Sequence, residues 1–397
     1  MIFNLFLLSN FYTHGAFESF QLLIFGDSLF LLLLLSFIAN KKLHLSRMGL
    51  ILILLLIVQN IISYIFLLQN IEVKLFLDNI NLIYCFLIFC ISLYIFLSYS
   101  QEDFDKTFQY WLVGSVLSVL VCYATLFGLG LEEWRLGVRI NGSFKAINQA
   151  QSFIGPALII SLYFYVSRSN KIIYLLIYLN LIILLLLTGS RASLIPIALS
   201  ILYIAFMTLL DLRNKGMANV LSNFAIFGIV MFSAGFLLNF LIFPAMGIGI
   251  DDFGSLTRLV DKLDEAAQGD LGPRQVQFQI VSENFYKYFF GIGFGTFQEF
   301  FDYRNEVHNT YLGVLIENGV LFFMIFIIFY VLMPIIFHIF LLTKKMPLLH
   351  CIFFIHYCLV SYQLTVYGFR QRIFWIELAL IIAYLNYLRQ SNARQNI

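Results

Sequence analysis

The feature that most constrains this chain is a series of long apolar runs without charged residues. Residues 172–187 and 320–342 contain no Asp, Glu, Lys or Arg. A helix needs about 20 apolar residues to cross a bilayer, and comparable runs recur along the whole sequence. The chain is 61% hydrophobic and only 12% charged, whereas soluble domains carry about twice that charged fraction. We therefore predict an all-α fold, a polytopic bundle of transmembrane helices.

The apolar runs predict about 11–12 spans. Residues 2–11 are too short to span alone, so they either lie in the interface or extend into a twelfth span. The predicted division is 1–246 as transmembrane helices, 247–309 as a periplasmic loop, and 310–397 as the C-terminal transmembrane helices. The spans are expected at 20–39, 48–69, 79–98, 108–130, 150–167, 172–188, 191–210, 219–245, 311–342, 347–366 and 373–388.

Basic residues in the short loops predict one orientation in a bacterial inner membrane. Short loops rich in Lys and Arg stay in the cytoplasm. Such loops are separated by even numbers of predicted spans, so a single topology satisfies them all. They carry Lys41, Lys42, Arg47, Arg168, Lys171, Arg213, Lys215, Lys344, Lys345, Arg389 and Arg394.

The same topology places four other segments in the periplasm, and these segments are rich in arginine. They are 131–149, 188–191, 247–309 and 367–372. Arginine normally avoids short external loops, so its concentration there predicts a function that involves anions. The arginines concerned are Arg135, Arg139, Arg191, Arg258, Arg274, Arg304, Arg370 and Arg372.

The segment 247–309 is the one sizeable water-facing piece, and it predicts two short helices. Residues 255–268 show an amphipathic pattern, and Pro273 suits the first turn of a second helix that runs to about Tyr288. Gly291, Gly293 and Gly295 follow without the preceding strand of a dinucleotide-binding fold. We therefore interpret the glycines as a loop.

Arg191 is the strongest candidate for anion binding. It follows Thr188, Gly189 and Ser190 in a break between two predicted spans, at the start of the next helix. Backbone N–H groups and the helix dipole favour an anion at that position, and a guanidinium matches phosphate bidentately. The alternative is an interfacial arginine that only reaches toward the headgroups.

Further candidates flank the predicted membrane surface. Arg139 precedes a span, and Arg274 begins the second loop helix, so both could join Arg191. His308 lies where the loop re-enters the membrane, and histidine can exchange a proton near neutral pH. Glu317 lies inside an apolar run, where an ionisable group is a functional candidate by default. Each also has an ordinary structural interpretation as a solvated, interfacial or packing residue.

Composition argues against several other classes of function. The net charge of +2 is too small to indicate nucleic acid binding. Asp251 and Asp252 lack a third metal ligand, so we predict no metal site, and nothing indicates a cofactor. The five cysteines fall inside predicted spans, where they are expected to act as small apolar side chains.

Three motifs together resemble the O-antigen polymerase and O-antigen ligase family, the Wzy and WaaL type. Each motif is short, but their order, spacing and predicted side of the membrane agree over residues 135–335. The first consists of Arg139, Gly142, Phe144 and Asn148; the second runs from Thr188 through Ser190 and Arg191 to Ala192; the third consists of Gly291, Gly293, Gly295, His308, Asn309, Glu317 and Gly319.

The resemblance implies a metal-independent, inverting glycosyl transfer at the periplasmic face. The donor would be a glycan on undecaprenyl diphosphate. Arg139, Arg191 and Arg274 would hold the diphosphate, and His308 would orient or deprotonate the acceptor hydroxyl. Ser190, Asn148, Asn309 and Glu317 would support this site.

The acceptor decides between two family functions. A polymerase, which we favour, extends another lipid-linked repeat, with a chain-length regulator as a candidate partner. A ligase instead modifies lipid A–core or a protein. A flippase for lipid-linked oligosaccharides is the alternative from another class. It is less favoured because its charges should lie deep in several spans, whereas the arginines here gather on one face.

Overall fold

A computed structural model describes eight long helical segments and parts of the segments that connect them. The described residues are 3, 4, 7, 73–126, 135–136, 139–140, 144, 147–188, 190–215, 273–283, 289–293, 296–301, 307, 309–364 and 371–395. The predicted spans 20–39, 48–69 and 219–245, the predicted loop helix 255–268 and His308 lie outside them. The chain divides into two compact units, and we describe each by itself.

The prediction of a helical membrane protein is confirmed. Each predicted span within the described residues coincides with a helix, and Gln101–Thr125, Ala150–Ser167 and Thr310–Leu341 are long and apolar enough to cross a membrane. The helices are α4 (Val73–Leu97), α5 (Gln101–Leu126), α6 (Ile147–Ser167), α7 (Lys171–Leu187), α8 (Leu194–Lys215), α12 (Pro273–Glu283), α13 (Phe297–Phe300), α14 (Thr310–Phe326), α15 (Met333–Leu341), α16 (Pro347–Tyr362) and α17 (Arg372–Gln395). A 3₁₀ turn, η2 (Arg191–Ser193), precedes α8, and a π-helical segment, η6 (Ile327–Leu332), follows α14.

Several helices continue beyond the apolar run that predicts them. α5 begins at Gln101, before the predicted start at 108, because polar residues form its first turn. The carboxylate of Asp103 accepts hydrogen bonds from the backbone N–H (3.0 Å) and hydroxyl (2.7 Å) of Ser100. This reciprocal capping arrangement stabilises a helix start without any apolar residue.

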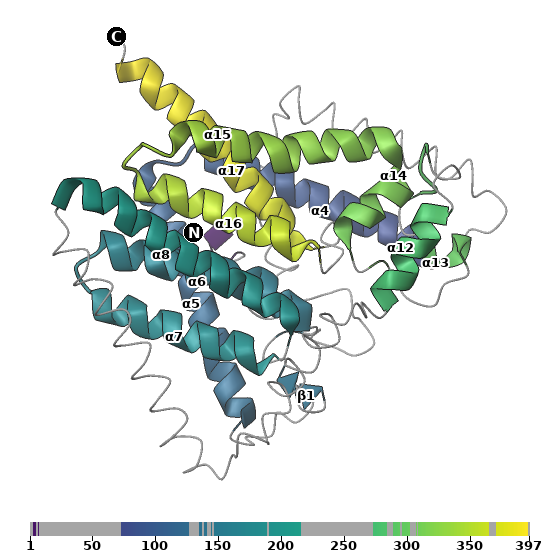
Figure 1. Cartoon of the computed structure of the whole chain (residues 1–397), viewed down its shortest axis with the longest axis horizontal. Coiled ribbons are helices and arrows are strands. Elements are labelled where there is room, and N and C mark those ends of the chain that lie inside the picture. Colours follow the sequence, from purple (N-terminus) through teal and green to yellow (C-terminus); the bar gives the residue numbers. More distant parts are fainter. Residues whose placement is uncertain are drawn as a thin grey trace, which may run out of the picture. The chain divides into compact units, whose positions relative to one another are not determined.

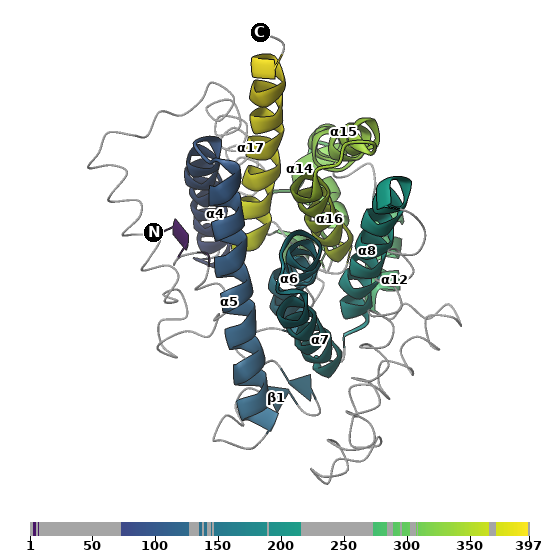
Figure 2. The ribbon, with the colours of Figure 1, turned by 90° about the vertical axis from the view of Figure 1, so that its left-hand side faces the viewer.

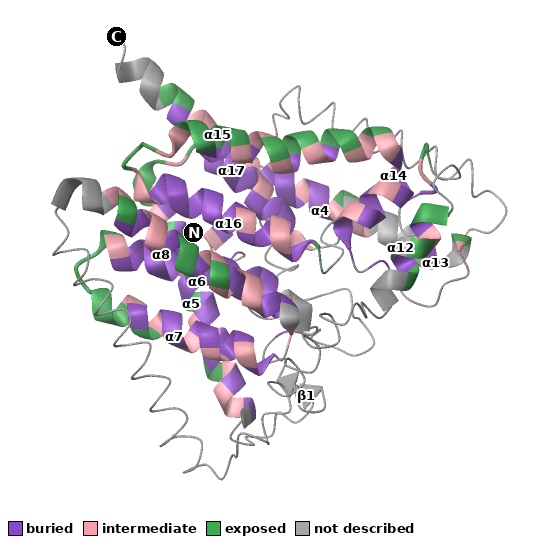
Figure 3. Cartoon of the chain, in the orientation of Figure 1, coloured by how far each residue is buried: buried purple, intermediate pink, exposed green. Residues whose placement is uncertain are grey.

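The first unit centres on α6, which lies beside both α7 and α8 (Figures 1 and 2). α6 is buried along most of its length (Figure 3). At its C-terminal end, the hydroxyl of Tyr163 donates to Asp105 of α5 (2.5 Å), and Arg168 forms an ion pair with the same carboxylate (2.9 Å). A helix that is surrounded by other helices needs small residues where its neighbours approach closely. Gly155 is such a residue, because a Cβ added there would contact Pro196 of α8 and Cys358 of α16.

The second unit contains α4, α17 and the long helical run from α14 through η6 to α15. α4 packs along α17 (Figure 2), and the Trp375 ring of α17 lies edge-on to Phe86 and Phe89 of α4, each at 6.2 Å between ring centroids. The run from α14 to α15 presents large apolar side chains outward (Figure 3), including Leu321 and Phe340. In a membrane protein such a surface faces lipid.

The helical run that spans 310–341 is irregular at two places that hydropathy does not predict. Gly319 has φ 82° and ψ 169°, so α14 is broken there. Further on, η6 precedes Pro334, whose ring nitrogen cannot donate to the carbonyl of Tyr330 four residues earlier. A missing helical hydrogen bond of this kind is a common cause of local rearrangement.

One small element of the described chain is a strand pair, within an architecture that is otherwise helical as predicted. β1 (Arg135–Leu136) pairs antiparallel with β2 (Arg139–Ile140), with Leu136 opposite Arg139. The pair lies in the segment 131–149, for which the sequence predicted only a position in the periplasm.

Candidate functional site

The turn that carries Arg191 joins α7 to α8. Thr188 is the C-cap residue of α7. Its backbone N–H donates to the carbonyl of Leu184 (3.2 Å), and its hydroxyl donates to the carbonyl of Leu185 (2.6 Å). The carbonyl of Ser190 then accepts the backbone N–H of Ser193 (3.0 Å), which closes η2. Arg191 is thus the first residue of a new helical turn, as the sequence predicted, although its side chain lies outside what the structure describes.

The start of α6 lies at the same end of the first unit as this turn. α6, α7 and α8 are joined by short connections, and α6 contacts η2 as well as α8. α6 and α8 therefore run in the same direction. A Cβ added to Gly155 would lie 3.0 Å from the Cβ of Pro196, which fixes their register. Position 148, in the first turn of α6, is consequently near the level of Arg191.

Phe144 fixes the segment that follows Arg139. Its side chain is buried, and its ring lies 6.1 Å from the ring of Phe153 in α6. Phe153 in turn stacks on Trp111 of α5 at 5.8 Å, and the indole N–H of Trp111 donates to the carbonyl of Phe153 (2.9 Å). The phenylalanine of the first motif therefore anchors the chain, and Arg139 belongs to the strand pair that precedes this anchor.

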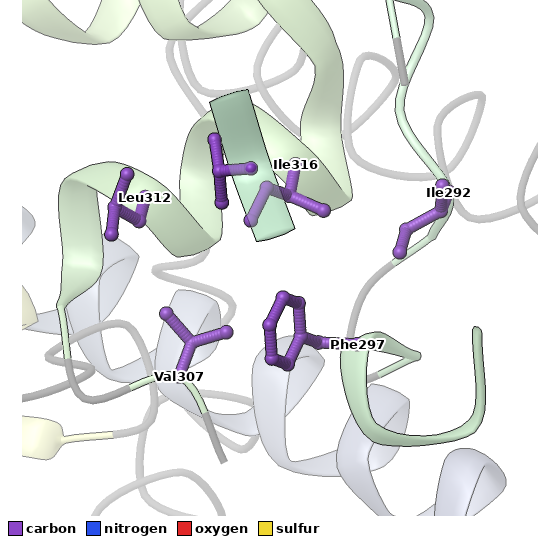
Figure 4. Packing of buried hydrophobic residues seen from close by; sticks show 6 residues of the cluster. Ile292, Phe297, Val307, Leu312 and Ile316 are labelled. Atoms are coloured by element: carbon purple, nitrogen blue, oxygen red, sulfur yellow. The ribbon is translucent and has the colours of Figure 1, made fainter. Parts of the chain in front are cut away.

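In the second unit, the described part of the segment 247–309 packs on α14 through a small apolar core (Figure 4). α12 contributes Val281, α13 contributes Phe297, and α14 contributes Leu312 and Ile316. α12 begins at Pro273 as predicted, so Arg274 is its second residue. The helices of this segment are consequently attached to the span that follows His308.

Asn309 forms the N-cap of α14. Its side-chain oxygen accepts the backbone N–H groups of Tyr311 (2.9 Å) and Leu312 (3.1 Å). His308 itself lies outside the described residues, but Val307 before it is buried in the apolar core of Figure 4. The chain on either side of the candidate base is therefore held by packing and by a cap.

The first turn of α14 is also tied to the end of α16. The backbone N–H of Thr310 donates to the carbonyl of Gln363 (2.9 Å), and the hydroxyl of Tyr311 donates to the carbonyl of Val360 (2.8 Å). Both donors are buried or half-buried, so these bonds replace hydrogen bonds to water that the interior does not offer.

Gly291 and Gly319 of the third motif form a crossing of two backbones, which is more than the loop predicted from sequence, and Gly295 lies outside the described residues. Gly291 has φ 86°, and a Cβ on it would lie 2.5 Å from the carbonyl oxygen of Glu317. Gly319 has φ 82°, and a Cβ on it would lie 2.7 Å from the carbonyl oxygen of Phe289. Neither position can hold a side chain without movement of the opposite backbone.

Hydrogen bonds across this crossing repair the break in α14. The N–H groups of Ile292 and Gly293 donate to the carbonyls of Ile316 (3.0 Å) and Glu317 (2.9 Å). In a continuous helix the Ile316 carbonyl would accept from Val320, whose N–H instead donates to Phe289 (3.0 Å). A broken helix is tolerated at membrane depth only where its backbone groups are satisfied by protein in this way.

Glu317 is buried, with 3% of its surface exposed, and directly precedes the break. Its carbonyl belongs to the crossing, so the backbone at this position is structural. A second buried carboxylate, Glu377 of α17, was not predicted from the sequence. Glu377 lies near Tyr330, whose hydroxyl accepts the amide N–H of Gln363 (2.7 Å). The signal that could have revealed Glu377 is the one used for Glu317, an acid inside an apolar run.

The predicted residues thus fall into two groups, one in each unit. Arg139, Asn148, Ser190 and Arg191 belong to the first unit, in which the start of α6 and the Arg191 turn come together. Arg274, His308, Asn309 and Glu317 belong to the second, in which the loop segment and the start of α14 come together. Among the described residues, no group of three metal-ligating side chains is present.

Residues 173–327 match the family model described as O-antigen ligase. This segment therefore belongs to the O-antigen ligase and polymerase family. The match contains the Arg191 turn and the glycine crossing, whereas the motif from Arg139 to Asn148 lies before it. The resemblance predicted from the motifs is confirmed, and with it a general role in polysaccharide assembly by a membrane protein. No curated protein matches the chain.

Proposed function

We propose that this protein is a polymerase that transfers a glycan from undecaprenyl diphosphate to a sugar hydroxyl at the periplasmic face of the inner membrane. The bond between the anomeric carbon and the diphosphate oxygen breaks, and a bond from that carbon to the acceptor oxygen forms. The acceptor proton leaves, and undecaprenyl diphosphate departs with its negative charge. The reaction inverts the anomeric centre and needs no metal.

In this proposal the arginines stabilise the departing diphosphate. Arg191 is the central group because it begins a helix, where the N–H groups of the first turn and the dipole add to the guanidinium charge. Arg139 and Arg274 complete the cationic site. Groups placed where charge develops in the transition state often accelerate a reaction by roughly 10²–10³-fold.

His308 takes the proton of the acceptor hydroxyl. The apolar core around Val307 and the cap at Asn309 support this role, because a general base must be held within hydrogen-bonding reach of its substrate. We propose that the segment 247–309 is the periplasmic loop that forms the glycan-binding side, since its described helices pack on the span that follows His308.

The observation that carries the proposal is the position of Arg191 at a helix start, beside the start of α6, within the segment that matches the family. Ligation to lipid A–core is the second candidate, because the matched family model is described as O-antigen ligase. The two reactions share the donor site and differ in the acceptor.

The proposal is tested with purified full-length protein in lipid nanodiscs and the lipid-linked glycan that builds up in cells lacking the gene. Extended lipid-linked chains on a gel are the expected product, and Arg191→Ala and His308→Ala should each greatly reduce their amount. Addition of lipid A–core distinguishes a ligase from a polymerase, because a ligase would yield capped core in place of longer lipid-linked chains.

Two results would contradict glycosyl transfer. One is transbilayer movement of the lipid-linked glycan without any new glycosidic bond, which would indicate a flippase. The other is undiminished product from both alanine variants, which would remove the proposed site even if the protein is a transferase.

A further inference from the structure

Gln151 of α6 is a buried amide whose hydrogen-bonding capacity is not used within the described protein. Only 1% of its surface is exposed. Neither its Nε2 nor its Oε1 atom has a hydrogen-bond partner among the described residues. A buried amide without partners destabilises a folded protein, and buried polar groups are otherwise almost always paired. The position of Gln151 therefore calls for an explanation other than folding.

The location of Gln151 relates it to the Arg191 turn. Positions 148, 151 and 155 follow the spacing i, i+3, i+7 and lie on one face of α6. Gly155 on that face approaches Pro196 of α8. Gln151 and η2 each lie about one helical turn before this contact, roughly 6 Å along the axis. Side chains in a helix lean toward its N-terminus, so the amide leans toward the end of the unit that carries Arg191.

The chemistry of the amide indicates which part of a substrate it would meet. A diphosphate offers only acceptors, so it would satisfy Nε2 and leave Oε1 without a donor. A sugar with adjacent hydroxyl groups or an N-acyl group both donates and accepts, so it can satisfy both atoms. We propose that Gln151 binds the sugar next to the diphosphate of the lipid-linked donor. This inference rests on the proposed function and adds the part of the donor that the start of α6 recognises.

Because the amide is closed from solvent, the sugar reaches it only when neighbouring groups move apart. A specific sugar regains the lost hydrogen bonds on binding, whereas a lipid without a sugar leaves them unmade. Sites that hold polar groups unpaired in this way discriminate strongly, because a ligand without the matching group gains nothing from the pocket. Gln151 should therefore set preference for the glycan-linked lipid over the bare lipid.

The test compares Gln151→Met, which keeps the approximate size of the side chain, with the wild type in nanodiscs. The probes are undecaprenyl diphosphate and the lipid-linked glycan extracted from cells lacking the gene. We expect an unchanged or higher Tm, unchanged affinity for bare undecaprenyl diphosphate, and affinity for the glycan-linked lipid lower by about tenfold, the equivalent of 1.4 kcal/mol. The donor KM should rise more than kcat falls.

Asn180→Leu provides a matched control in the same unit. Both polar atoms of the Asn180 amide have a partner, since Oδ1 accepts from the hydroxyl of Tyr123 (2.6 Å) and Nδ2 donates to the carbonyl of Leu176 (2.8 Å). Its loss should lower the Tm and leave the ratio of the two lipid affinities unchanged. The inference would be overturned if Gln151→Met also had a lower Tm and an unchanged ratio of the two lipid affinities. It would likewise be overturned if neither Gln151→Met nor Gln151→Leu folded, because the amide would then be structural.

The outcome also separates this inference from the proposed function. A wild-type protein that binds neither lipid and makes no product contradicts both. If the wild type transfers glycan and Gln151→Met keeps the full preference for the glycan-linked lipid, only the role of Gln151 is refuted.

Discussion

Gly291 and Gly319 lie backbone against backbone, so that a Cβ on Gly291 would be 2.9 Å from the nitrogen of Gly319, and a Cβ on Gly319 would be 2.8 Å from the nitrogen of Gly291. Both residues have positive φ, which side chains disfavour. Gly291 and Gly319 of the third motif are therefore two halves of one structural contact, which joins the loop to the broken span.

Substitution at this crossing should destabilise the fold. Gly319→Ala adds a strained backbone conformation, which costs about 1–3 kcal/mol, to a collision with backbone atoms that cannot rotate away. We expect a loss of folded protein in membranes and a Tm lowered by several degrees, measured by size-exclusion chromatography and thermal unfolding in detergent. Gly291→Ala should behave alike.

Phe290→Ala is the control for the crossing. Phe290 adjoins Gly291, but 78% of its surface is exposed, so its removal should change the free energy of unfolding by less than about 0.5 kcal/mol. Normal yield and Tm for both glycine variants would mean that the two backbones do not meet as described.

The span positions could be predicted from the sequence because hydropathy measures the property that decides them. The residues 172–188 were predicted and α7 occupies 171–187. The break at Gly319 could not be found in this way, because it lies inside the uniformly apolar run 311–342. Its cause is a positive φ and a partner 28 positions away, and neither leaves a mark on hydropathy.

The candidate site was predictable in part, for a different reason. Arg191 was found because its residue type is unusual at a predicted membrane surface, and Asn309 because it stands in a motif. The cap formed by Asn309 and the anchor formed by Phe144 depend on contacts that only the fold supplies. Gln151 was missed because an amide in a polar helix start is ordinary, and only its burial without partners distinguishes it.

The Asn309 cap leads to a second prediction. Asn309→Ala leaves the first N–H groups of α14 without their acceptor and should lower the free energy of unfolding by about 1 kcal/mol. Asn309→Asp and Asn309→Ser keep a side-chain oxygen there and should retain most of the stability. Thermal unfolding of the three variants measures the effect.

Glycan transfer should follow stability in the same series, because the role of Asn309 is to fix the start of α14. A variant with the wild-type Tm but without transfer would show that the amide acts on the substrate directly.

Close packing at Gly155 leads to a third prediction. A Cβ there would lie 2.7 Å from the Sγ of Cys358 and 3.0 Å from the Cβ of Pro196. Gly155→Ala should therefore destabilise the first unit by about 1–3 kcal/mol through overpacking. Cys358→Ala removes the nearer obstacle, so the double variant should be more stable than the sum of the two single changes indicates.

Cys351→Ala is the matched control for that pair. Cys351 is also buried in α16, but it is not among the atoms nearest to the added Cβ. Its effect on the free energy of unfolding should simply add to that of Gly155→Ala. Equal coupling for both cysteines would point to a general loosening of α16 instead of one local collision.

The last prediction separates charge from geometry at Arg191. For Arg191→Ala we expect kcat/KM for glycan transfer to fall by roughly 10²-fold. Arg191→Lys keeps the positive charge but loses the planar pair of donors that fits a phosphate, so its kcat/KM should fall by less. Arg168→Ala is the control, an arginine of the same unit whose partner is Asp105 (2.9 Å) and whose side chain is 45% exposed. An exposed ion pair contributes at most about 1 kcal/mol, so this variant should keep nearly all of its transfer activity. If the Arg168 and Arg191 variants lose activity equally, the loss reflects a general effect of arginine removal, and Arg191 has no special place in the reaction.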